Sequence, residues 1–160
     1  IITRVLFRLQ KNERMILDYG NVKEEFEKSG QKDLAALRNV IIRIRESKLP
    51  SVEEYGNAGS FFKNPVIPSE KLDQLKEIHD QIPQYPANNG VKVPAAWLID
   101  RCGLKGYREG IVGTWPGQPL VIVNYGGASG RQIFEFSEKI RTAVRNRFGI
   151  ELEREVQAIE

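Results

Sequence analysis

Two short apolar segments followed by a long amphipathic segment restrict the fold more than any other feature of the sequence. Residues 110–115 and 120–124 predict two strands joined by a Pro-Gly turn. The next segment predicts a helix that begins at Ser129, a favourable N-cap residue, and continues to about Phe148. Neighbouring strands followed by a helix indicate a mixed domain of the α+β class.

Amphipathic segments predict further helices upstream. Residues 33–48 form the clearest of them, because Leu34, Leu37, Ile41 and Ile44 recur on one face opposite Arg and Glu side chains. Shorter helices are predicted at residues 22–28, from Pro68-Ser69 to about Ile82, and from Pro94 to Gly103. Residues 83–90, which are rich in Pro, Asn and Gly, predict a loop.

Both ends of the chain resemble strands. Residues 2–9 are rich in β-branched and aromatic side chains, and residues 151–159 follow the glycine that ends the last helix. The chain also begins Ile1-Ile2-Thr3, without an initiator Met and already inside the first of these patterns. We therefore expect a piece of a longer protein, in which the neighbours of the first strand lie outside this chain.

Composition excludes several classes of function. The 160 residues carry a net charge of only +3, and Lys and Arg alternate with Glu and Asp, so a nucleic-acid partner is not expected. No apolar run approaches the roughly 18 residues of a membrane span. One cysteine and one histidine cannot form a disulfide framework and are too few for a zinc site. This usage is typical of a reducing cytoplasm, and we expect no metal.

Several residues that often carry chemistry have simpler interpretations here. The run YGGASGR, residues 125–131, matches neither dinucleotide nor P-loop spacing, so we interpret it as a strand-to-helix turn rather than a phosphate loop. His79 lies among charged residues and is predicted on the surface. Cys102 is predicted as a small buried hydrophobe rather than a nucleophile. Trp97 and Trp115 are predicted in the core, although Trp115 also precedes a turn that can line a ligand cleft.

The stretch GNAGSFFKNP, residues 56–65, is unlike ordinary loop or core. Its glycines allow the backbone to approach a ligand closely, and Ser60 precedes Phe61 and Phe62, whose rings can exclude water. A tight turn entering a strand has the same composition. Composition alone therefore leaves a structural and a functional interpretation open.

The same stretch closely resembles the signature of the bacterial UDP-N-acetylenolpyruvoylglucosamine reductases (MurB). The resemblance continues in the family's order over nearly the whole chain, through YG, SKLP, AAWLIDRCGLKG, QPLVIVN and LEREV. The last of these is similar to the family's LEPEV, with Arg154 in place of Pro, and Gln157 stands where the family often has Arg. Either departure can alter the register of the terminal strand or the charge around it.

This resemblance implies a domain organisation. Residues 1–50 correspond to the end of the FAD-binding region, residues 51–149 to the complete C-terminal substrate-binding domain, and residues 150–160 to a strand that returns to the flavin domain. The chain would thus be an α+β substrate-binding domain with a remnant of the preceding FAD-binding domain. The N-terminal flavin domains and their glycine-rich phosphate loops would be missing partners within the same protein.

The resemblance also implies a reaction and its residues. NADPH and FAD serve the full-length enzyme in reducing UDP-N-acetylglucosamine enolpyruvate to UDP-N-acetylmuramate, a cytoplasmic step of peptidoglycan and cell-wall synthesis. Ser60 corresponds to the proton donor, and Glu155 to the catalytic glutamate that steadies the enolate. Substrate contacts are implied at four positions, namely Tyr19, Lys48, Asn64 and Gln118.

A different class of function remains open beside this one. The chain is also consistent with a stand-alone nucleotide-sugar binding module that performs no catalysis. No residue is assigned to cofactor binding, and we expect no cofactor and no activity from these 160 residues alone. The presence or absence of flavin domains in the whole protein distinguishes the two functions.

Overall fold

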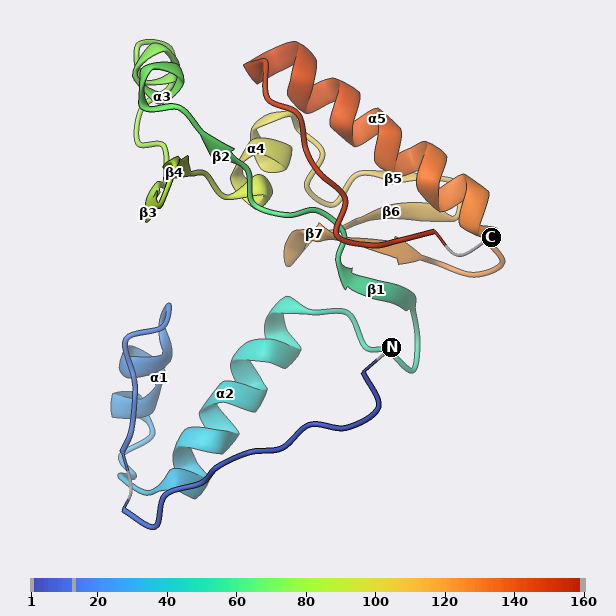
Figure 1. Cartoon of the computed structure of the whole chain (residues 1–160). Helices are drawn as coiled ribbons and strands as arrows, with labels where there is room; N and C mark the ends of the chain where they lie inside the picture. The colour runs from blue at the N-terminus through green and yellow to red at the C-terminus, as the bar shows by residue number, and fades with distance from the viewer. Residues whose placement is uncertain (1, 13, 159–160) are drawn as a thin grey trace. The chain divides into compact units, whose positions relative to one another are not determined.

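A computed structural model describes residues 2–12 and 14–158 of the chain (Figure 1). It divides into two compact units, the first ending at Ser47 and the second beginning at Lys48. The described residues combine α-helices with antiparallel sheets, which confirms the predicted α+β class.

The first unit contains the two helices that the sequence predicts, α1 (Val22–Lys28) and nearly all of α2 (Leu34–Lys48). Asp33 accepts a hydrogen bond from the backbone N–H of Ala36 at 2.7 Å and so caps α2. The buried face of α2 differs from the predicted one, because Leu34 and Ile41 are exposed. The side chains that are buried in this unit are Val22, Phe26, Ala36, Leu37 and Val40.

Residues 2–9, predicted as a strand whose neighbours lie outside this chain, form no strand in the structure described. Residues 2–12 are assigned to no helix or strand, and Val5, Leu6 and Phe7 are exposed. A strand needs a neighbouring backbone to receive its hydrogen bonds, and none of the described residues pairs with this segment. This apolar segment therefore has no strand to pair with among the described residues.

The second unit is built on a four-stranded antiparallel sheet with spatial order β1-β7-β6-β5. The strands are β1 (Gly56–Ser60), β7 (Gln118–Asn124), β6 (Val112–Trp115) and β5 (Arg108–Glu109). The helices α4 (Ala95–Arg101) and α5 (Gly130–Phe148) contact β7, and both lie on one side of the sheet in Figure 1. The predicted strand pair and the predicted long helix are confirmed.

Side-chain and backbone caps explain the bounds of α5. The Ser129 hydroxyl accepts from the backbone N–H of Gln132 at 3.3 Å, and the Gln132 side chain accepts from the Ser129 N–H at 2.9 Å. Gly149 has φ of 63°, the left-handed conformation that ends helices. The glycine-rich run before α5 is therefore a strand-to-helix turn with Ser129 as N-cap, as predicted.

A smaller three-stranded sheet, of order β2-β4-β3, lies next to α3 (Ser69–Lys76). Its strands are β2 (Val66–Ile67), β4 (Gly90–Lys92) and β3 (Tyr85–Ala87). The loop predicted at residues 83–90 thus contains most of a hairpin. The helix predicted to reach Ile82 ends at Lys76, and the chain then turns, with Gln81 at φ of 55° and Ile82 buried in the core.

One hydrophobic core fills the second unit. Phe61 and Phe62 from the chain after β1, Leu98 from α4 and Val144 from α5 are almost fully buried in it. Leu152, beyond the last helix, is 1% exposed and belongs to the same core. The segment after α5 is therefore held by side-chain burial.

The strand predicted at residues 151–159 is replaced by an extended segment with one isolated antiparallel bridge, Phe62 to Arg154. In Figure 1 this segment, drawn in red, runs beside the green chain that follows β1. A strand needs several successive backbone pairs, and this segment forms only one such pair with the described residues. Residue 159 lies outside the described residues.

Candidate functional site

The stretch that contains Ser60 forms an irregular edge strand. Ser60 lies opposite Val121 of β7, and the register between Asn57 and Ser60 is shifted. Gly59 has φ of 71° and donates its N–H to the Asn57 side chain at 3.0 Å, a local turn that creates the shift. Ser60 is exposed at the end of this bulge.

The two aromatic residues after Ser60 do not cover it in this structure. Phe61 and Phe62 are 2% and 1% exposed and pack within the core. They anchor the strand end that carries the serine hydroxyl. Exclusion of water from Ser60 therefore requires groups other than these two rings.

Glu155 lies next to the strand end that carries Ser60, although 95 positions separate the two residues in the sequence. The backbone N–H of Glu155 donates to the Phe61 carbonyl at 2.9 Å, and the Phe61 N–H donates to the Leu120 carbonyl at 2.8 Å. Both Ser60 and Glu155 are exposed. The terminal segment thus brings the Glu155 carboxylate close to the strand end that carries the Ser60 hydroxyl.

A lysine stands near the same carboxylate. Lys63 forms an ion pair with Glu153, and its N–H donates to the Glu153 carbonyl at 2.9 Å. The hydrogen bond from Glu153 raises the pKa of Lys63, and the charge of Glu155 adds to this effect. The ammonium therefore remains charged at neutral pH and contributes a positive potential near Glu155.

The Lys48 carbonyl lies against Gly117, in the turn between β6 and β7 and next to Gln118 in the chain. A Cβ atom on Gly117 would lie 2.6 Å from the Lys48 carbonyl oxygen, so only glycine permits this approach. Gln118 is the next residue and begins β7, the strand that Ser60 pairs with three residues further on. The fold therefore gathers Lys48, Gln118, Ser60 and Glu155 around one end of β7.

Asn64 has a structural partner. Its side-chain oxygen accepts a hydrogen bond from the backbone N–H of Ala95 at 2.9 Å, which satisfies one donor at the start of α4. The side-chain amide N–H₂ group is the part of Asn64 that has donors for a ligand. Tyr19 belongs to the first unit and is 84% exposed.

His79 and Cys102, for which the sequence predicts ordinary structural positions, have specific surroundings in the structure. His79 was predicted on the surface, but it is only partly exposed and its ring contacts Trp97 and Phe148. The prediction for Cys102 agrees with its packing against the core, and burial raises the pKa of its thiol while the Arg147 charge opposes this. A raised pKa leaves little reactive thiolate at neutral pH.

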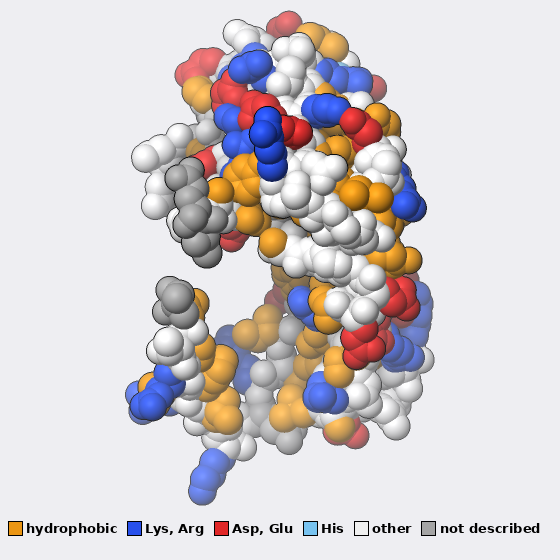
Figure 2. Space-filling view, turned by 90° about the vertical axis from the view of Figure 1, so that its right-hand side faces the viewer, with side chains coloured by type: hydrophobic (Ala, Val, Ile, Leu, Met, Phe, Trp, Pro, Cys, Tyr) orange, Lys and Arg blue, Asp and Glu red, His pale blue; other side chains and the backbone are white. Residues whose placement is uncertain are grey.

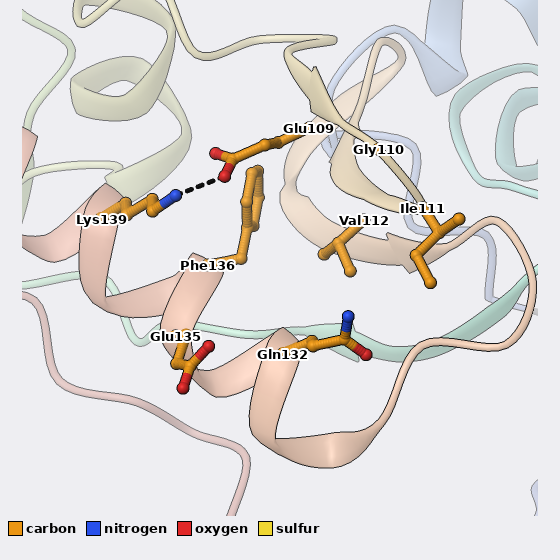
Figure 3. A pocket seen from close by; sticks show the side chains of 8 residues that line it. All are labelled: Glu109, Gly110, Ile111, Val112, Gln132, Glu135, Phe136 and Lys139. Atoms are coloured by element: carbon orange, nitrogen blue, oxygen red, sulfur yellow. Dashed lines mark hydrogen bonds and ion pairs between the residues drawn. The ribbon is translucent and has the colours of Figure 1, made fainter.

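A hollow of about 350 Å³ lies between the β5–β6 hairpin and α5, where Phe136 and Val112 form an apolar floor (Figure 3). The Glu109–Lys139 ion pair crosses its edge. None of the six residues singled out above from the signature and its surroundings lines it. Figure 2 shows acidic and basic side chains intermixed on the face in view, without a broad patch of one charge.

Comparison with known proteins identifies the family. Residues 50–159 match the family described as "UDP-N-acetylenolpyruvoylglucosamine reductase, C-terminal domain". The chain belongs to this reductase family. A relative from Chromobacterium violaceum is 44% identical over 97% of the chain and 46% of its own length. Relatives from Bacteroides fragilis and Porphyromonas gingivalis are 44% and 52% identical over 99% and 79% of the chain.

The chain spans about half the length of the curated reductases it matches, from 38% to 48% of those compared. All three are named UDP-N-acetylenolpyruvoylglucosamine reductase. Within the described residues, no helix is long and apolar enough to cross a membrane, and no group of three His, Cys, Asp or Glu side chains is arranged to hold a metal ion.

The turn before α5 does not fit a flavin phosphate. The backbone N–H groups of Gly126 and Ala128 both donate to the Asn124 side chain, at 2.9 and 3.1 Å, and that of Ser129 donates to Gln132. A phosphate-binding loop needs such groups directed at the ligand. This turn of the reductase domain therefore serves the fold.

Sequence reasoning missed an aromatic cluster on the sheet. Tyr55 contacts Trp115 and Tyr125, with ring centroids 5.7 and 5.4 Å apart, and the Arg108 guanidinium lies 4.0 Å from the Tyr125 ring centre. These residues come from three separate segments, so no local pattern indicates them. Trp115 is partly buried within the cluster rather than in the main core.

The close approach at Gly117 yields a first prediction. We expect Gly117→Ala to reduce the free energy of unfolding by about 1–3 kcal/mol, because the new methyl group meets the Lys48 carbonyl. Urea denaturation followed by tryptophan fluorescence measures the change. Gly130→Ala is the matched control. Gly130 is the first residue of α5, and a Cβ atom there meets nothing within 4 Å. Equal midpoints for Gly117→Ala and the parent would contradict the prediction.

Proposed function

We propose that this chain is the substrate-binding part of a flavoenzyme that reduces UDP-N-acetylglucosamine enolpyruvate to UDP-N-acetylmuramate with NADPH, in the cytoplasmic synthesis of peptidoglycan. Membership of the reductase family supports this proposal. In this reaction FAD supplies the hydride, and it would be held by parts of the protein outside residues 48–160.

The observation that carries the proposal is the hydrogen bond from the Glu155 N–H to the Phe61 carbonyl. It brings the glutamate of the LEREV segment next to the serine of the GNAGSFFKNP signature. A hydroxyl and a carboxylate from opposite ends of a domain then act on one substrate. If Ser60 and Glu155 had separate structural roles, they would not need to lie close together.

In the proposed chemistry Ser60 delivers a proton to the enolpyruvyl carbon, and Glu155 stabilises the enolate formed at the substrate carboxyl group. An alcohol is a poor acid in water, so the exposed Ser60 hydroxyl has to be desolvated before it can act. The bound substrate and the flavin-binding part of the protein would supply this covering. The buried Phe61 and Phe62 hold the serine in position while this happens.

The diphosphate of the nucleotide sugar is assigned to Lys48, Gln118 and Asn64. Lys48 and Gln118 lie together at the turn that Gly117 permits, at the end of β7 that also carries the partner of Ser60. An ammonium and amide N–H groups are suitable donors for phosphate oxygens. Tyr19 is proposed to cover the ligand when the first unit is in its position in the whole protein.

Lys48→Ala tests the substrate assignment. We expect the dissociation constant for UDP-N-acetylglucosamine derivatives to rise about tenfold or more, because a charge-assisted hydrogen bond contributes roughly 1.5–3 kcal/mol. NMR titration of the protein measures it and also locates the ligand. Lys76→Ala is the control, since it removes the same charge from the exposed side of α3. Unchanged affinity in Lys48→Ala, or shifts confined to residues far from β7, would reject the assignment.

The catalytic proposal has a direct test of its own. A full-length protein that carries this region should oxidise more NADPH than its own flavin consumes only when the enolpyruvyl substrate is present, whereas the 160-residue chain by itself should bind no FAD. A full-length protein that binds the nucleotide sugar without oxidising NADPH would instead support the alternative, a binding module.

A further inference from the structure

The side chain of Arg154 connects the terminal segment to α5. Its Nε donates to the Ser137 hydroxyl at 2.8 Å, and its terminal N–H₂ group pairs with Glu138 at 2.6 Å. The guanidinium carbon also lies 5.1 Å from the centre of the Phe134 ring. Three side chains within about one turn of the same helix thus hold a single arginine.

The contact with Ser137 is partly buried, and the carboxylate of Glu138 is shared with a second arginine. Ser137 is 0% exposed and donates its own hydroxyl proton to the Phe134 carbonyl at 2.7 Å, so its oxygen is oriented to accept from Arg154. Glu138 also pairs with Arg141, which lowers the pKa of the Glu138 carboxyl together with Arg154. Arg141 in turn donates to the Leu152 carbonyl at 2.8 Å. The network therefore holds the terminal segment at Leu152 and at Arg154.

The backbone on either side of Arg154 is paired as well. Lys63 donates to the Glu153 carbonyl and Glu155 donates to the Phe61 carbonyl, each at 2.9 Å, so these bonds flank the Phe62–Arg154 bridge. The Arg154 side chain is held against α5, and the backbone N–H of the next residue, Glu155, is held by the Phe61 carbonyl. These two attachments fix the point from which the Glu155 side chain projects.

We propose that Arg154 is a positioning residue, which acts by orienting the Glu155 carboxylate beside the strand end that carries Ser60. The inference rests on the proposed function, since it assigns Arg154 a role in the same reaction. Without the contacts to Ser137 and Glu138, the segment keeps its backbone hydrogen bonds to Phe61 and Lys63 but loses the attachment of residue 154 to α5, so that the Glu155 carboxylate can shift. A displacement of about 1 Å in a catalytic group can reduce the rate on the order of a hundredfold.

The test uses the full-length enzyme and a double-mutant cycle. We expect Arg154→Ala to reduce kcat by about tenfold or more with KM changed by less than about twofold. Arg154→Lys should restore part of the rate, because an ammonium replaces some but not all of the guanidinium contacts. In a Glu155→Gln background, Arg154→Ala should reduce kcat by little more, since its effect passes through the carboxylate. Arg131→Ala, which removes an exposed surface pair on the same helix, is the control and should retain parent kinetics.

Two results overturn the positioning role. One is a parent-like kcat in Arg154→Ala, and the other is an equal loss on removing Arg154 with and without the Glu155 carboxylate. If Glu155→Gln itself retains the parent rate, the catalytic assignment of Glu155 fails and the role of Arg154 fails with it. If Glu155→Gln is slow but Arg154→Ala is not, only the positioning inference is wrong. Faster amide exchange at Glu155 in Arg154→Ala is expected in addition, and it reports the loosened segment independently of turnover.

Discussion

In a full-length protein carrying this region, Ser60→Ala should slow reoxidation of the reduced flavin by the enolpyruvyl substrate at least about a hundredfold. A positioned general acid typically contributes on the order of 10² to 10⁴ in rate, equivalent to about 3 to 5 kcal/mol of barrier. Flavin reduction by NADPH needs no proton on the enolpyruvyl carbon, so that half-reaction should remain near normal. Rapid-mixing absorbance of the flavin follows both steps separately.

Substrate affinity should change little in the same variant. The Ser60 backbone is held by pairing with β7, and the two phenylalanines after it are anchored in the core, so loss of the hydroxyl leaves the strand end in place. Ser51→Ala is the control, because Ser51 is also exposed and uses its carbonyl to accept the hydrogen bonds of its turn. Reoxidation of Ser60→Ala at the parent rate would show that Ser60 is only a turn residue.

The second large effect concerns stability. We expect Phe62→Ala to reduce the free energy of unfolding by about 3–5 kcal/mol, the usual cost of truncating a fully buried phenylalanine. Phe62 is 1% exposed, contacts Phe61 with ring centroids 5.5 Å apart, and pairs with the terminal segment through its backbone. Its removal leaves a cavity where the signature, the core and that segment meet. Urea denaturation followed by tryptophan fluorescence measures the loss, because both tryptophans lie in the second unit.

Ile78→Ala provides the comparison for this variant. It also removes a large apolar side chain, but Ile78 is 76% exposed, so its truncation should change the free energy of unfolding by no more than about 0.5 kcal/mol. Similar midpoints for the two variants would mean that Phe62 is not a central core residue.

Helices could be predicted well where capping and periodicity agree. The bounds of α1 and α5 follow from the sequence, since α5 has a capping box at Ser129 and a left-handed glycine at its end. The end of α3 at Lys76 could not be predicted, because the residues that follow it are compatible with a helix and the chain turns before Gln81, ahead of the buried Ile82. The exposed positions of Leu34 and Ile41 likewise depend on what packs against α2.

The strand-like ends show a different limit. Residues 2–9 and 151–158 have composition typical of strands, but a strand forms only where another backbone accepts its hydrogen bonds. The first has no partner among the described residues, and the second obtains a single bridge at Arg154. Composition therefore indicated a tendency in both segments, and pairing decided the outcome.

The sequence by itself determined the α+β class, the principal helices, the central strand pair and the family that the signature around Ser60 indicates, because these depend on local order along the chain. Only the tertiary structure brought Glu155 to the signature, joined Lys48 to Gln118 across Gly117, and attached Arg154 to Ser137 and Glu138. Such contacts connect distant segments through hydrogen bonds and burial that arise only when the core is closed. Local sequence patterns do not predict such contacts, so in the sequence Arg154 is only a departure from the LEPEV motif.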